Sequence, residues 1–234
     1  MFKRKVVFAV LVLLAAVLYT TKLSGQEIVK TYDNKDFTSV SLSHAMNCQL
    51  TQSDKYSIEI KAGKEDFEYL KVEQKGNAVR IYIDKNNYSS DSEIKVKITM
   101  PVLTDLNLSG ASRVKLTMNV PGKNFSSKLS GSSYIEGSLT SGDIDISLSG
   151  SSKVKLNGNG DDLELNASGS SNMKLKDFAV KNADVQLSGS SLAELNLNGK
   201  LNTQQSGNSL IVYYGKADLG STNFSGSSGI KKGE

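Results

Sequence analysis

The chain of 234 residues contains no tryptophan, two prolines, one cysteine and one histidine. The single cysteine, Cys48, excludes a disulfide within the chain, and its place in a strand-like stretch over residues 46–50 predicts a buried structural thiol. Because His44 is the only histidine, zinc sites, Ser-His-Asp triads and Cys-His nucleophiles lack parts. We therefore expect no catalytic residue, no metal ligand and no cofactor.

An excess of positive charge is also lacking once the N-terminal segment is set aside. Residues 1–25 carry four of the 28 basic residues and no acidic residue, so residues 26–234 carry 24 basic and 24 acidic residues. The formal charge of +4 therefore belongs to that segment. With no basic excess in the remainder, the composition gives no support for a nucleic-acid partner or for binding to anionic lipid.

The first 25 residues have the order of a secretory signal peptide. Basic residues at positions 3 to 5 precede an apolar run over residues 6–19, and Ser24 and Gly25 supply small side chains before Gln26. The run is short for a membrane span, so we predict no stable span after cleavage. An uncleaved anchor stays open. Export to the periplasm, the outer surface or the medium is expected.

A Ser-Gly phrase recurs seven times in the C-terminal half, at intervals of 18 to 21 residues. Such short units cannot bury their own apolar faces and must stack on one another. A glycine at each corner is expected where the backbone needs positive φ or approaches the next unit closely. The structural corner glycines are Gly110, Gly131, Gly150, Gly169, Gly189, Gly207 and Gly226.

Each repeated unit reads as two strands around a glycine corner. In one unit Ile144, Ile146 and Leu148 alternate with polar residues, and Val154 and Leu156 do so after the corner. This pattern predicts an all-β fold, a parallel β-helix (solenoid) over residues 105–234 with coils of about 19 residues that stack about 4.8 Å apart.

Residues 26–104 show alternating strands without the Ser-Gly phrase and are predicted to form an irregular β-rich region that caps the solenoid. This region can consist either of wider, less regular coils or of a sandwich-like cap. Residues 65–70 are expected to form one helical turn. At the other end, Lys231 and Lys232 should discourage further strand pairing. Tyr213, Tyr214 and Phe224 are expected there either to close the core or to form a subunit contact.

Outward positions after the corner form two columns that are mostly solvated surface. Four positions of the first column are the candidate surface contact. Exposed ion pairs between adjacent coils, Lys115–Glu136, Glu136–Lys155 and Lys174–Glu194, are expected to contribute a few tenths to about 1 kcal/mol each. The candidate contact residues are Arg113, Tyr134, Lys153 and Asn172.

The Leu-Ser-Gly-x-Ser-x-Val-Lys-Leu units at residues 108–116 and 148–156, the lead-in at 98–103 and the Val-Tyr-Tyr-Gly string at 212–215 carry a resemblance. Over residues 36–230 the chain resembles the family called putative auto-transporter adhesin, head GIN domain. The resemblance implies an exported β-helical protein of Gram-negative bacteria. It implies no catalytic or binding residue.

The export signal and the repeat favour a non-catalytic envelope or extracellular protein that uses a β-helical surface for adhesion, carbohydrate contact or envelope organisation. The expected partner is a glycan or a cell-surface component, and the oligomeric state is left open. One alternative is a carbohydrate-active enzyme, a lyase or hydrolase, which needs converging carboxylates. Asp143 and Asp145 share one outward face, but we expect no acidic partners beside them in adjacent coils. The other alternative is a purely structural, self-assembling module.

Overall fold

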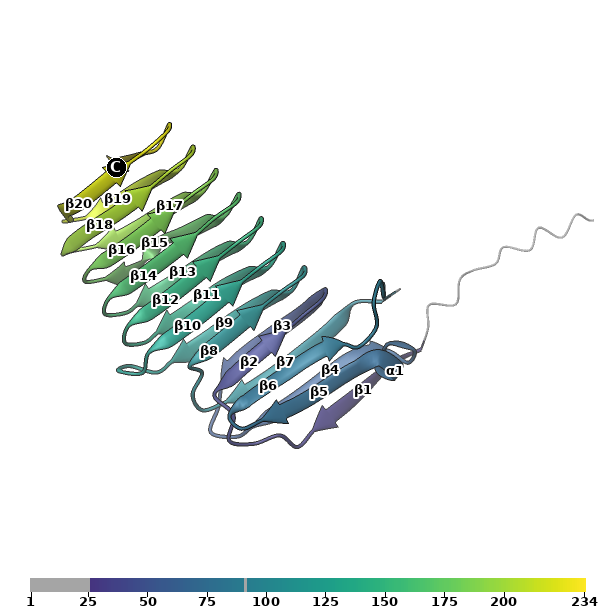
Figure 1. Ribbon diagram of the computed structural model, residues 1–234. Coiled ribbons are helices and arrows are strands. Elements are labelled where there is room, and N and C mark those ends of the chain that lie inside the picture. Colours follow the sequence, from purple (N-terminus) through teal and green to yellow (C-terminus); the bar gives the residue numbers. More distant parts are fainter. Residues whose placement is uncertain (1–25, 91) are drawn as a thin grey trace, which may run out of the picture.

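The computed structural model describes residues 26–90 and 92–234, so the predicted signal peptide lies outside the described residues. Figure 1 shows two β-sheets stacked face to face along one rod, with the short helix α1 (Asp66–Tyr69) at one end and β20 at the other. One sheet has eleven strands and the other has ten. The predicted parallel β-solenoid is confirmed. Neither described stretch contains a helix with the length and hydropathy of a membrane span.

Each repeated unit contributes one strand to each sheet, and equivalent strands of successive units pair in parallel. The units therefore stack as coils. The ten-stranded sheet receives β8 (Asp105–Leu108), β10 (Phe125–Leu129), β12 (Ile144–Leu148), β14 (Leu163–Ala167), β16 (Ala183–Leu187), β18 (Lys200–Gln205) and β20 (Asp218–Phe224). The eleven-stranded sheet receives β9 (Arg113–Asn119), β11 (Tyr134–Thr140), β13 (Lys153–Asn159), β15 (Asn172–Val180), β17 (Leu192–Leu197), β19 (Leu210–Gly215) and β21 (Gly229–Lys232).

The core lies between the two sheets and follows the period-two pattern of the sequence. Val154, Leu156, Met173 and Leu175 are at most 2 % exposed and pack between the sheets with the other aliphatic side chains. Inward-facing residues of successive coils lie opposite one another, as Val154 does Met173, although β-bulges shift the register locally, as between Lys155 and Gly158. The core is one continuous column of aliphatic side chains.

Glycine is required at the corners for two reasons: the backbone has positive φ, and the preceding coil leaves no space for a side chain. Gly150 has φ of +72°, and a Cβ atom there would lie 2.5 Å from the carbonyl oxygen of Gly131 in the preceding coil. The same oxygen accepts a 2.8 Å hydrogen bond from the amide of Ser151. The hydroxyl of Ser152 bonds the carbonyl of Ser149 within its own corner, at 2.8 Å. A side chain at the corner would therefore separate the coils that this hydrogen bond joins.

The region before the repeats contains seven strands, and their stacking order differs from their order in the chain. β2 and β3 pair with β8 and β9, while β6 and β7 lie one layer further out. The strands are β1 (Glu27–Tyr32), β2 (Ser39–Leu42), β3 (Met46–Gln52), β4 (Ser57–Gly63), β5 (Leu70–Lys75), β6 (Ala78–Ile83) and β7 (Ile94–Met100).

The β2–β3 connection is an eighth corner, which the sequence analysis did not expect because histidine replaces the glycine. His44 has φ of +69° and lies directly beneath Gly110, whose added Cβ would be 2.9 Å from the His44 Cα atom. The amide of Ala111 donates to the His44 carbonyl oxygen, as at the other corners. Histidine tolerates the left-handed region better than bulkier residues do. Cys48, on β3, is buried, and burial raises the pKa of its thiol.

Antiparallel strands and aromatic side chains close the rod at the α1 end. β4 pairs antiparallel with β7, β1 with β4, and β5 with β6. Phe37 is fully buried with its ring 5.0 Å from that of Tyr56, and Tyr69 lies 5.2 Å from Tyr88. The expected helical turn is present as α1. Its Asp66 carboxylate is buried and accepts hydrogen bonds from the Gly63 amide and the Tyr88 hydroxyl.

The last coil, formed by β20 and β21, lacks such a cover among the described residues. Leu219 and Phe224 are each 45 % exposed, whereas Tyr213 packs against the core. Of the aromatic residues expected to close this end, Phe224 does not do so. It lies on β20, the terminal strand of the ten-stranded sheet, so no further coil covers it.

We expect Gly150→Ala to lower the free energy of unfolding by about 2–5 kcal/mol, because it combines a strained left-handed residue with an inter-coil clash. Gly122 is the matched control, since its φ is +70° but nothing lies within 4 Å of an added Cβ. Gly122→Ala should cost only about 1–2 kcal/mol. Denaturant unfolding of the two variants measures the difference. Equal losses in the free energy of unfolding would show that the clash with the preceding coil does not contribute.

Candidate functional site

A groove of about 900 Å³ runs along the ten-stranded sheet beside the corners, from β2 to β20. Two columns of polar side chains line it, with a mostly aliphatic row between them, and the whole is termed the serine–amide groove. The row between them consists of Leu42, Leu108, Leu129, Leu148, Ala167, Leu187, Gln205 and Phe224. The first column consists of the residues three positions before each corner glycine, namely Asn107, Lys128, Ser147, Asn166, Gln186, Gln204 and Asn223. The second consists of the serines just before each glycine, namely Ser109, Ser130, Ser149, Ser168, Ser188, Ser206 and Ser225.

Parallel pairing sets the spacing of the first column. Ser147 lies opposite Lys128 on one side and Asn166 on the other, and Gln186 lies opposite Gln204. Neighbouring strands in a sheet are about 4.8 Å apart, so the column presents one polar side chain at each such step. The groove is therefore a periodic array built from one position of the repeat.

Most amides of the column are free to bind a ligand. In the described parts of the chain, the side chains of Asn107, Gln186, Gln204 and Asn223 have no hydrogen-bond partner, whereas Asn166 donates to Glu164 at 3.2 Å. Each free amide offers two donor hydrogens and an acceptor oxygen. These amides are uncommitted, whereas the second-column hydroxyls of Ser130, Ser149, Ser168 and Ser188 each donate to a carbonyl oxygen of the preceding coil at 3.4–3.5 Å.

One buried amide also faces the groove. Gln205 is 2 % exposed and stands where the preceding coil has Leu187. Its Oε1 accepts from the Ser209 hydroxyl at 3.5 Å, but its Nε2 has no partner among the described residues. Buried donors are nearly always paired in proteins, so this one is an exception that a bound ligand or water can satisfy.

Charge divides the face of the ten-stranded sheet in two. The serine–amide groove, as the structure describes it, is lined by no carboxylate, and its two cations are Arg80 and Lys128. A second hollow of about 520 Å³ lies near the strand beginnings and holds six carboxylates. These belong to Asp105, Asp143, Asp145, Asp162, Glu164 and Asp184.

This second hollow corrects one expectation. Asp145 does have an acidic partner in one adjacent coil, because it lies opposite Glu164, which in turn lies opposite Asp184 of the coil beyond. The expectation was wrong because the coils were compared at positions after the corner, whereas these carboxylates stand five residues before the glycine. Like charges at adjacent positions are destabilising. Asparagines offset part of this repulsion: Asn202 donates to Asp184 at 2.7 Å and Asn182 to Asp162 at 2.9 Å.

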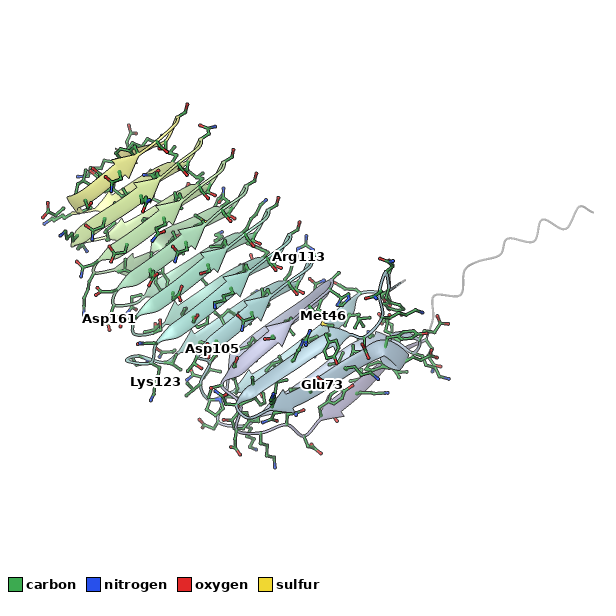
Figure 2. All side chains as sticks on the ribbon, viewed as in Figure 1. Met46, Glu73, Asp105, Arg113, Lys123 and Asp161 are labelled. Carbon is green, nitrogen blue, oxygen red and sulfur yellow. The ribbon has the colours of Figure 1, made fainter. Side chains whose placement is uncertain are left out.

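The carboxylates of the hollow form a row rather than a ligand cage. In residues 26–90 and 92–234, no group of three or more histidine, cysteine or acidic side chains has an arrangement that could hold a metal ion. Figure 2 shows Asp105 and Asp161 toward the edge of the rod away from the corners, and Arg113 near the corner edge. On the same sheet, the acidic row therefore lies toward the strand beginnings and the serine–amide groove toward the corners.

The candidate contact residues predicted from the sequence lie together, but on the other sheet. Tyr134 is opposite both Arg113 and Lys153, and Asn172 follows Lys153, so the column exists in the predicted register on the eleven-stranded sheet. The groove was missed because only positions after the corner were compared. The same alignment read three residues before each glycine would have found its asparagines and glutamines.

The expected ion pairs of the neighbouring column do not form. The described residues make four ion pairs, Glu27–Lys61, Glu93–Lys95, Glu59–Lys97 and Asp161–Lys181. Glu136 accepts a 3.0 Å hydrogen bond from the Tyr134 hydroxyl on its own strand instead. This contact also raises the pKa of Tyr134, after the larger effect of burial.

Comparisons with known proteins agree with this architecture. The family model described as putative auto-transporter adhesin, head GIN domain, matches residues 36–217. A putative adhesin from Bacteroides fragilis has a similar structure, with a TM-score of 0.83 and 21 % identity, covering 88 % of this chain and 97 % of that one. No curated protein matches the chain.

Two proteins from Parabacteroides are similar to a lesser degree. A putative lipid binding protein from Parabacteroides distasonis gives a TM-score of 0.71 at 19 % identity and covers 90 % of this chain and 98 % of that one. A putative adhesin from Parabacteroides merdae gives 0.71 at 17 % identity, with 90 % and 97 % covered. At these identities the likeness shows the fold.

We expect Gln205→Leu to raise the free energy of unfolding by about 1–3 kcal/mol, because it replaces an unpartnered buried amide with the aliphatic residue of the preceding coil. Gln204→Leu, on the exposed side of the same strand, should change it by less than about 0.5 kcal/mol. Thermal unfolding of both variants is the measurement. A loss of stability in Gln205→Leu would mean that its amide is satisfied within the protein.

Proposed function

Because the chain belongs to the family of putative auto-transporter adhesins with a head GIN domain, we propose that it is an exported, non-catalytic protein that contacts carbohydrate through the serine–amide groove. The contact serves adhesion or the organisation of the cell envelope. The observation that carries the proposal is the first column of the groove, in which the amides of Asn107, Gln186, Gln204 and Asn223 have no hydrogen-bond partner among the described residues.

Carbohydrate fits the chemistry of this column. Sugar hydroxyls both donate and accept hydrogen bonds, and side-chain amides supply both functions in fixed geometry. A groove open along its length accepts an extended chain, and its regular spacing lets one ligand make the same contact at several coils.

Two other binding modes are alternatives to carbohydrate binding in the groove. One structural neighbour is named a putative lipid binding protein. The aliphatic row of the present groove suits an acyl chain, whereas its two polar columns suit a polyhydroxylated chain, which is the ligand proposed here. Arg113, Tyr134, Lys153 and Asn172 form a contact candidate on the opposite sheet. Variants of the two faces distinguish these modes.

We expect the purified protein to bind a subset of glycans on an array, and Gln186→Ala/Gln204→Ala to weaken that binding at least about tenfold. Each lost hydrogen bond contributes about 0.5–1.5 kcal/mol, and 1.4 kcal/mol corresponds to a factor of ten. Arg113→Ala/Lys153→Ala is the matched control and should bind as the unmodified protein does. Loss confined to that control would place the contact on the other sheet, and binding to lipid vesicles alone would refute a glycan ligand.

A carbohydrate-active enzyme is the second candidate, and the acidic row favours it specifically. Glycoside hydrolysis uses a pair of carboxylates, and Asp143 and Asp145 lie in the hollow with Glu164. The glycans that bind are therefore also assayed for cleavage. Turnover that Asp143→Ala and Asp145→Ala abolish would replace the first proposal with this one. Binding without cleavage supports the non-catalytic role.

Export is part of the proposal, with the periplasm, the outer surface and the medium as the candidate locations. Cell fractionation and protease treatment of intact cells distinguish them. Adhesion requires the protein to be digested on intact cells, whereas an envelope-organising role is expected if only permeabilised cells expose it. Recovery from the cytoplasm would contradict export.

A further inference from the structure

The two ends of the rod differ in whether the apolar core is covered. At the α1 end, antiparallel strands and aromatic rings cover it, and Phe37, Ile58 and Val79 are fully buried. At the other end, the core side of the last coil is open. Leu219 and Phe224 are two of the three large apolar side chains exposed in the described residues, and the third, Val29, lies on β1.

The last coil also carries two unpaired strand edges. β20 and β21 are the terminal strands of the ten- and eleven-stranded sheets, so each presents free backbone donors and acceptors on one side. Figure 1 shows these two strands together at the end of the rod. Exposed apolar side chains lie between these two unpaired strand edges. This is the arrangement expected where a solenoid core ends without a cover.

The charges of this coil are self-complementary. Residues 218–234 contain Asp218 and Glu234 as acids and Lys231 and Lys232 as bases, so their side chains balance. Lysines on an edge strand oppose pairing with an uncharged strand. Pairing with a second copy brings the acids of one coil near the bases of the other, which offsets that cost.

We propose that the β20–β21 coil is a docking surface for the same coil of a second copy, giving a tail-to-tail dimer. In a two-fold arrangement the edge strands meet antiparallel, and Leu219 and Phe224 of both copies are buried in one continuous core. At the α1 end β1 and β5 are also edge strands, but there the core between the sheets is covered by antiparallel strands and aromatic rings, so no apolar core is left to join a second copy. The association therefore closes at two copies and does not extend into a filament.

Analytical ultracentrifugation of the purified protein over a range of concentrations tests the proposal. We expect a monomer–dimer equilibrium, and we expect Leu219→Glu/Phe224→Glu to weaken it at least about 30-fold, since buried apolar anchors carry most of the energy of an interface. Val29→Glu is the matched control, because Val29 is 53 % exposed on an edge strand of the opposite end. That variant should dimerise normally.

Several results would overturn the proposal. These are a monomer at every concentration, a series of higher oligomers, or a dimer that Val29→Glu breaks and Leu219→Glu/Phe224→Glu leaves intact. Hydrogen exchange of the unmodified protein gives an independent test if the double variant fails to fold. Amide protection in β20 and β21 should rise with protein concentration while that of β1 stays constant, and unchanged protection in β20 and β21 would refute the dimer.

Discussion

The close approach of one corner to the next is the constraint on which the whole rod depends. The carbonyl oxygen of Gly131 lies where a side chain of Gly150 would begin, and it also accepts a hydrogen bond from the coil above. A corner without a side chain thus allows the strands of both sheets to reach pairing distance. At the last corner of the series His44 takes the place of glycine and has the same positive φ. It is tolerated there because its side chain points toward Ile83, away from the coil that lies against its backbone.

In-register stacking has a second effect, which is to turn each position of the repeat into a line along the surface. Substitutions at one position give a row of amides, and at another a row of carboxylates. The two rows are only two residues apart on a strand, as Asp145 and Ser147 show, yet between β8 and β16 their surroundings differ in charge. A binding surface of this kind is specified by a column in the alignment of repeats, and no single residue defines it.

The repeat made the fold predictable, because its period fixes both strands and corners and leaves few other ways to bury the aliphatic residues. What surrounds the repeat was harder to predict. The corner at His44 has the right neighbours but lacks the glycine, and the antiparallel cover at the α1 end depends on pairing between distant strands. The groove was missed for a different reason: Asn107 and Gln204 have ordinary surface character individually, and only their alignment shows that they form a row.

The position of β2 and β3 has a kinetic consequence. These strands precede β6 and β7 in the chain but lie between them and β8–β9 in the stack. A chain that emerges from its N-terminus cannot complete this layer until residues some sixty positions later have arrived, as the pairing of Leu42 with Leu108 shows. Since non-local pairing slows folding, we expect this layer to be completed more slowly than the later coils, whose paired strands are one repeat apart.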